Sequence, residues 1–130
     1  MELTFKKSER LCSKIIIEKL YKEGSSFLSY PLRFVYIKLE SESKDNNQVL
    51  ITASKKTFKR AVDRNLIKRR IREAYRLHKH SLHDFKDLTF AINYIGKQIE
   101  DFSKIEEQVI KGFETIKKRI VQTKKSTENV

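Results

Sequence analysis

The 130-residue sequence has one cysteine, one proline and three glycines, and it has no apolar run of about 18 residues that could span a membrane. The single cysteine, Cys12, excludes an internal disulfide and a cysteine-based metal cluster. Few prolines and glycines argue against a linker-rich or low-complexity chain. The first residues, 1–7, lack the apolar middle region of a signal peptide. We therefore expect a cytoplasmic protein in a reducing compartment.

Acidic residues are also scarce relative to basic ones. The chain has 29 Lys and Arg against 17 Asp and Glu, a formal net charge of +12 and a pI near 9.8. The excess positive charges repel one another in a compact fold and destabilise it, and an anionic partner would offset that cost. Nucleic acid is the commonest such partner, and a membrane surface is the competing one.

The positive charge is concentrated in one region. Residues 54–80 hold eleven Lys or Arg and two acidic residues, Asp63 and Glu73, so about a fifth of the chain has a net charge of +9. Evenly spread charge would indicate solubility alone. This concentration predicts a binding patch.

The order of elements predicts a single α+β sandwich over residues 1–121, followed by a flexible polar tail over 122–130. Ser13 is a candidate N-cap for a helix over 14–23, and Gly24 would end that helix in the left-handed conformation. The remaining expected elements are strands over 27–40 (two strands if Pro31 breaks the run), 48–54 and 87–96, and helices over 58–80 and around Ile105, Val109, Phe113, Ile116 and Ile120. We expect the strands over 27–40 and 48–54 to form an antiparallel hairpin.

The helix over 58–80 is the most informative element. At about 100° per residue, five cations and one amide fall within an arc of about 140°: Arg64, Asn65, Lys68, Arg69, Arg72 and Arg76. Ile67, Ile71 and Ala74 form a core-facing stripe beside this arc. An ordinary solvated helix is the simpler interpretation, but few acidic partners are available to relieve the repulsion.

Residues 54–76, SKKTFKRAVDRNLIKRRIREAYR, resemble the signature of the protein subunit of bacterial ribonuclease P. The matching positions are Ser54-Lys55-Lys56, Ala61-Val62, Arg64-Asn65, Lys68-Arg69 and Arg72-Glu73. The order of elements agrees from about residue 3 to residue 121. Residues 57–60, TFKR, replace the usual Gly-Asn, so the entry to the helix must differ locally.

The resemblance implies a fold like that of a ribosomal protein domain and of domain IV of elongation factor G, with a left-handed βαβ crossover. It also implies a function: binding a catalytic RNA and the 5′ leader of precursor tRNA, and assisting the endonucleolytic removal of that leader to give the mature 5′ end. The RNA subunit and its Mg²⁺ would carry the hydrolysis, while the protein alone would bind no cofactor or metal. The partners would be RNA, not DNA and not a membrane.

The resemblance further implies two binding surfaces. The catalytic RNA would contact the basic helix and its approach, through Lys56, Arg60, Arg64, Asn65, Lys68, Arg69, Arg72 and Arg76. The leader would lie between the first helix and the sheet, against Tyr21, Phe34, Tyr36, Lys38, Ser54 and Lys55. Strand alternation puts Phe34, Tyr36 and Lys38 on one face, where rings and a cation suit single-stranded RNA. The alternative for Phe34 is a place in the core.

No residues of the chain form a recognisable catalytic set. His78, His80 and His83 do not share one helical face, and no glycine-rich phosphate loop is present. We therefore expect no catalytic residue and no metal site in the protein itself. Two alternatives stay open: a general ribosomal-type RNA-binding protein, which would bind precursor and mature tRNA equally, and a protein enzyme that cleaves RNA unaided.

Overall fold

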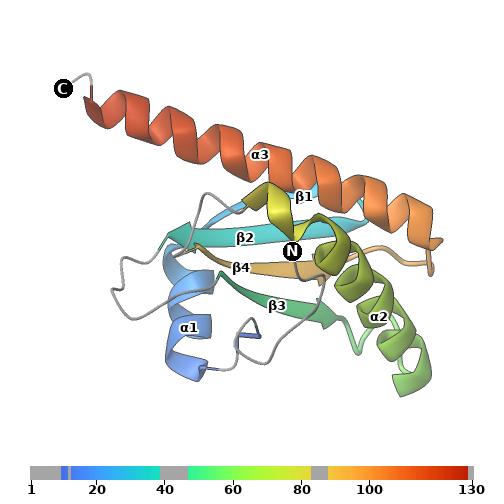
Figure 1. Cartoon of the computed structure of the whole chain (residues 1–130). Helices are drawn as coiled ribbons and strands as arrows, with labels where there is room; N and C mark the ends of the chain where they lie inside the picture. The colour runs from blue at the N-terminus through green and yellow to red at the C-terminus, as the bar shows by residue number, and fades with distance from the viewer. Residues whose placement is uncertain (1–9, 12, 39–46, 83–87, 129–130) are drawn as a thin grey trace.

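The computed structural model describes residues 10–11, 13–38, 47–82 and 88–128, with the backbone alone from residue 122 (Figure 1). Its elements are α1 (Lys14–Glu23), β1 (Ser25–Ser29), β2 (Leu32–Lys38), β3 (Gln48–Ala53), α2 (Ala61–His78), a short 3-10 helix η2 (Lys79–Leu82), β4 (Leu88–Tyr94) and α3 (Phe102–Glu128). The predicted strand over 27–40 is two strands, β1 and β2, separated by a turn at Tyr30–Pro31.

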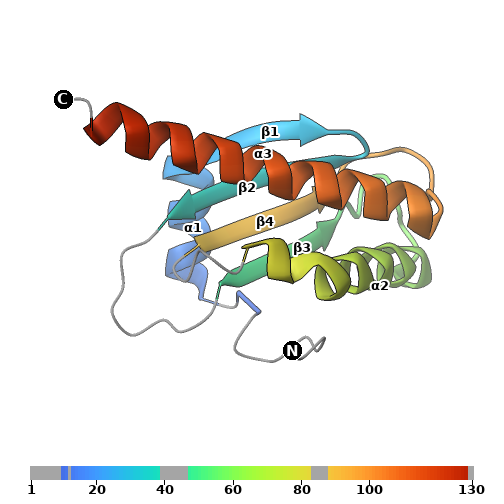
Figure 2. The same cartoon turned by 45° about the horizontal axis from the view of Figure 1, so that its top comes forward.

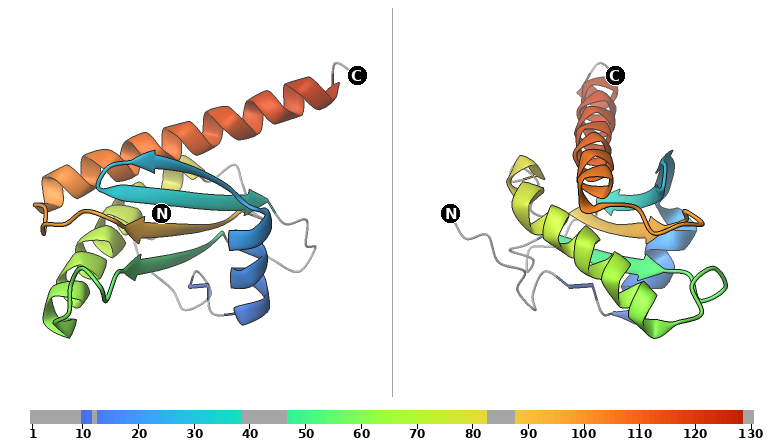
Figure 3. Two further views of the ribbon diagram at one scale, coloured as in Figure 1. Left: turned by 180° about the vertical axis from the view of Figure 1, so that it is seen from behind. Right: turned by 90° about the vertical axis from the view of Figure 1, so that its right-hand side faces the viewer.

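The strands form one sheet in the order β1-β2-β4-β3. Helices α2 and α3 cover one face of this sheet, and α1 lies against the other, as Figures 2 and 3 show from two sides. Figure 1 also shows that α3 continues past the edge of the sheet at its C-terminal end. The helix continues to Glu128, beyond residue 121 where the sequence analysis ended the domain.

The predicted hairpin of the strands over 27–40 and 48–54 is wrong. β4 lies between β2 and β3, antiparallel to β2 and parallel to β3, and the antiparallel hairpin is formed by β1 and β2. β4 is buried along almost its whole length, as expected of a central strand.

β3, α2 and β4 form the crossover unit. In Figure 1 both strands point to the right, β4 lies above β3, and α2 lies in front of the sheet. Seen along the strands, the chain turns anticlockwise as it advances, so this crossover is left-handed, against the strong general preference. The α+β sandwich and the crossover that the resemblance implied are both confirmed.

The hydrophobic core has two unequal parts. The larger part fills the space between the sheet and helices α2 and α3, and its fully buried side chains include Phe34, Ile67, Phe90, Ile92 and Phe113. The smaller part lies under α1 and consists of Leu11, Leu20, Val35 and Ala91, with partly buried aliphatic side chains around it. α1 is therefore attached by a small contact, whereas α2 and α3 form the main layer.

The ends of α1 confirm one prediction and correct another. The Ser13 side chain accepts a hydrogen bond from the Ile16 backbone N–H, so Ser13 is the N-cap. Gly24 ends the helix, but its φ of −73° is ordinary extended backbone and not left-handed. Glycine is required by a close approach instead, because a Cβ at Gly24 would lie 2.3 Å from the Leu20 carbonyl oxygen.

Candidate nucleic-acid interface

Helix α2 presents a basic outer face because its apolar residues are buried on the other side. Ile67, Ile71, Ala74 and also Tyr75 are buried against the sheet and α3. The side chains that point outward include Asn65, Arg69 and Arg72, all exposed, while Lys68 is half-buried at the edge of the face. No hydrogen bond or ion pair of these four side chains is found with any described residue. Together with exposed Lys56 and Arg60, they form the α2 basic surface.

Arg64 has a different role from its neighbours. Its guanidinium donates to the backbone carbonyls of Phe58 and Lys59, at 2.8 and 3.0 Å. Phe58 is buried and packs against Tyr94, with ring centroids 5.8 Å apart. Arg64 and Phe58 thus fix the loop that carries the unusual TFKR residues, and they compensate for an N-cap, Arg60, that makes no side-chain capping bond. Arg64 supports the basic surface rather than extending it.

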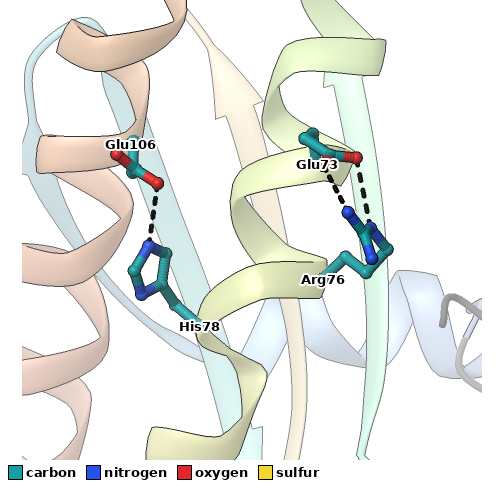
Figure 4. A network of polar contacts seen from close by, with 4 residues as sticks. All are labelled: Glu73, Arg76, His78 and Glu106. Carbon is teal, nitrogen blue, oxygen red and sulfur yellow. Dashed lines mark hydrogen bonds and ion pairs between the residues drawn. The ribbon is translucent and has the colours of Figure 1, made fainter. Parts of the chain in front are cut away.

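Arg76 is balanced by a carboxylate of its own helix. Its guanidinium pairs with Glu73 at 2.5 Å, one turn away, as Figure 4 shows. The hydrogen bond from Arg76 lowers the pKa of the Glu73 carboxyl, and the same bond raises the pKa of Arg76. The pair lies at the C-terminal end of α2. It leaves Arg69 and Arg72 as the exposed guanidinium groups on the outer face.

The histidines do not gather into a site in the part of the chain that the structure describes. His78 Nε2 lies 3.0 Å from a carboxylate oxygen of Glu106 and links α2 to α3 (Figure 4). His83 lies outside the described residues. Among the residues described, no group of three or more His, Cys, Asp or Glu could hold a metal ion, and no helix is long and apolar enough to cross a membrane.

The prediction that Phe34, Tyr36 and Lys38 line the surface beside α1 is wrong. Val35 and Ile37 are the β2 residues that pack in the small core under α1, so Phe34, Tyr36 and Lys38 belong to the opposite face of the sheet. Phe34 is fully buried and stacks on Phe27, with centroids 5.2 Å apart. Tyr36 also packs into the large core.

The Phe34 side of β2 faces α3 because the Phe34 ring fits beneath that helix. A Cβ at Gly112 would lie 2.3 Å from the Phe34 ring, so the glycine makes room for it. Lys38 is exposed at the C-terminal end of β2. It lies five residues from Arg33, or about 17 Å along the strand.

The other three predicted leader residues, Tyr21, Ser54 and Lys55, are exposed. Tyr21 is 43% exposed at the C-terminal end of α1. Ser54 and Lys55 are exposed and follow β3 directly, at the start of the loop that leads to α2. This loop connects the end of β3 to the start of α2, as Figure 3 shows.

The open part of the sheet on this side carries a row of residues that sequence reasoning missed. Register pairs Leu28 with Arg33, Arg33 with Asn93, and Asn93 with Thr52, so the row crosses all four strands. Leu28 is 68% exposed and Arg33 is exposed. The Tyr21 hydroxyl donates to Asn93 Oδ1 at 2.9 Å. We call Tyr21 and this row the α1-side surface.

The signal that could have located the row is a polar residue inside an apolar strand. Asn93 follows Phe90, Ala91 and Ile92 in β4, and Thr52 interrupts β3. Polar side chains in a central strand need partners or solvent. The sequence alone does not say that the two residues are neighbours.

Comparison with known proteins gives one consistent result. The family model described as Ribonuclease P matches residues 5–117. The ribonuclease P protein component of Porphyromonas gingivalis is 40% identical over 112 residues, which cover 82% of this chain and 81% of that protein. The solved ribonuclease P protein of Staphylococcus aureus has a TM-score of 0.70 at 22% identity, covering 84% of this chain and 95% of that one. The protein from Thermotoga maritima has a TM-score of 0.67 at 23% identity, covering 81% and 94%.

Proposed function

Because this chain belongs to the ribonuclease P protein family, we propose that it binds the catalytic RNA through the α2 basic surface and the 5′ leader of precursor tRNA through the α1-side surface. Membership makes it a component of an endoribonuclease complex that acts in tRNA 5′ processing and contains an RNA partner. The division of the two RNAs between two surfaces is the proposal, and the cytoplasm is its expected place.

The observation that carries the proposal is the exposed, unpaired state of the cations on α2. Arg69 and Arg72 point outward and have no carboxylate partner among the described residues, in contrast to Arg76. Guanidinium forks match phosphate oxygens bidentately. A row of them on a rigid helix favours binding to the phosphate backbone of a folded RNA, because the positive side chains repel one another when no anion neutralises them.

The α1-side surface suits a single strand. It offers a partly exposed ring, Tyr21, for stacking, a cation, Arg33, and an amide, Asn93, on an open sheet. Base stacking on an aromatic side chain contributes about 1–3 kcal/mol per base. Ser54 and Lys55 lie next to this surface, so a strand that leaves it meets the loop toward α2.

In this proposal the protein supplies no reacting group. The RNA subunit and its Mg²⁺ carry the phosphodiester hydrolysis. The protein positions the leader and neutralises charge between two RNAs, through Lys56, Arg60, Lys68, Arg69 and Arg72 on one side and the α1-side surface on the other.

Reconstitution tests the proposal. The protein is mixed with a bacterial ribonuclease P RNA, and the affinities of the complex for precursor tRNA and for mature tRNA are measured at low Mg²⁺. We expect tighter binding of the precursor, and we expect Tyr21→Ala to reduce that difference while the protein still assembles with the RNA. Lys118→Ala, an exposed change on α3, is the control and should have neither effect.

Two results would replace the proposal with its alternatives. Equal affinities for precursor and mature tRNA would favour a general ribosomal-type RNA-binding protein. Cleavage of precursor tRNA by the purified protein, stripped of all RNA, would establish a protein enzyme.

A further inference from the structure

Asn93 is the most constrained polar side chain of the α1-side surface. Its Oδ1 accepts two hydrogen bonds, one from the Tyr21 hydroxyl of α1 at 2.9 Å and one from the Thr52 hydroxyl of β3 at 2.7 Å. The three residues come from three different elements, so the amide is fixed from both sides. Its plane and direction are therefore set before any ligand arrives.

The two hydrogen bonds decide which half of the Asn93 amide can still bind a ligand. A carbonyl oxygen has two lone pairs, and both are occupied here. The Nδ2 group has no partner among the described residues. It is also not one of their buried unpaired polar atoms, which are Gln48 Oε1 and His80 Nε2. Asn93 thus presents two N–H donors to solvent and no acceptor.

Arg33, the neighbouring side chain, also offers only hydrogen-bond donors. Arg33 pairs with Asn93 in the β2–β4 register and points to the same face, where directly opposed Cβ atoms are about 4.5–5.5 Å apart. Arg33 is exposed and has no described partner. A guanidinium only donates. The pair therefore offers hydrogen-bond donors alone, beside the Tyr21 ring.

A donor-only pair distinguishes the purines. Guanine presents two adjacent acceptors, O6 and N7, whereas adenine has a donor, N6–H₂, in place of O6. An asparagine commonly binds adenine by accepting from N6 and donating to N7. That arrangement is closed to Asn93, because Tyr21 and Thr52 already occupy its oxygen.

We propose that Asn93 and Arg33 read one nucleotide of the precursor-tRNA leader and favour guanine over adenine there. This inference rests on the proposed function, since it assigns a base preference to the surface that binds the leader. Tyr21 stacks against either purine, so the hydrogen-bonding edge alone makes the difference. One well-formed bidentate contact gives a discrimination on the order of tenfold.

The experiment uses the reconstituted holoenzyme and precursor tRNAs that differ at a single leader nucleotide. Each leader position is set in turn to guanine or adenine, and kcat/KM is measured for each substrate. We expect one position at which guanine exceeds adenine about tenfold.

Asn93→Asp is the decisive variant, because a carboxylate still accepts from Tyr21 and Thr52 but turns an acceptor outward in place of the donors. It should abolish the guanine preference while leaving the melting temperature and the affinity for the catalytic RNA unchanged. Arg33→Ala should also weaken the preference, and Lys118→Ala on α3 should not.

The possible outcomes distinguish a failure of this inference from a failure of the proposed function. If precursor is bound more tightly than mature tRNA but no position favours guanine, or if Asn93→Asp keeps the preference, the inference is overturned and the function stands. A uniform loss of kcat/KM for all leaders in Asn93→Asp would mean a phosphate contact and would also overturn it. If precursor and mature tRNA bind equally, the proposed function itself fails.

Discussion

Replacing Arg69 and Arg72 with alanine should weaken assembly with the catalytic RNA and flatten its dependence on salt. These two guanidinium groups are exposed on the outer face of α2 and have no described partner. Arg64 is a poorer choice, because it holds the Phe58 and Lys59 carbonyls and its loss would disturb the start of the helix. The double variant therefore removes phosphate contacts without removing a structural bond.

The size of the effect follows from counterion release. Each lost phosphate contact lowers the slope of log K against log salt by about 0.7–0.9, so two contacts lower it by about 1.4–1.8. Between 50 and 200 mM salt, a difference of this size corresponds to a roughly tenfold change in relative affinity. The defect of the double variant should thus be about tenfold larger at the lower salt concentration.

The assay is equilibrium binding of the protein to a bacterial ribonuclease P RNA over a series of KCl concentrations. Lys104→Ala combined with Lys118→Ala is the matched control, because it removes the same charge from exposed positions on α3. An unchanged slope in the α2 variant, or an equal change in the control, would refute the assignment of α2 to the RNA interface.

Three further changes test the structure around the two surfaces. Phe34→Ala should lower the free energy of unfolding in urea by about 3–5 kcal/mol, while the folded fraction binds precursor tRNA with unchanged affinity; a lower affinity with unchanged stability would return Phe34 to the leader surface. Gly112→Ala should also destabilise, by about 1–3 kcal/mol of overpacking against Phe34, and a higher urea midpoint would show that the ring can move aside. Glu73→Gln should remove a small acid-dependent part of the stability. The Arg76 hydrogen bond lowers the pKa of Glu73, so the pair stabilises the fold fully above the ordinary glutamate pKa, and this contribution is lost as the pH falls through the lowered pKa of the folded state. Urea unfolding of both proteins at neutral and at acidic pH would measure this, and identical pH dependence would contradict it.

The α2 basic surface was largely readable from the sequence because a single helix carries it. The spacing of Ile67, Ile71 and Ala74 predicts the buried stripe, and that stripe fixes which side chains point outward. What the spacing could not give is the state of each cation. Arg64 and Arg76 belong to the same arc as Arg69, yet one caps a loop and the other pairs with Glu73.

The α1-side surface could not be read in the same way. Alternation along β2 separates Phe34 and Tyr36 from Val35 and Ile37, but it does not say which set meets α1. Both sets are apolar, so local pattern is equally compatible with either face. The glycine in α3 that makes room for Phe34 decides the matter, and it is 78 residues away in the sequence.

The sequence by itself therefore determined the helices, the three segments that contain the four strands, the basic face of α2 and the family. Only the tertiary structure decided the order of the strands, the face of the sheet that α1 leaves open, and the meeting of Tyr21, Thr52 and Asn93. The physical reason is the separation along the sequence over which each interaction acts. Helical periodicity and charge spacing act between residues a few positions apart, whereas strand pairing and shared hydrogen bonds join residues 41 and 72 positions apart, and no local pattern records them.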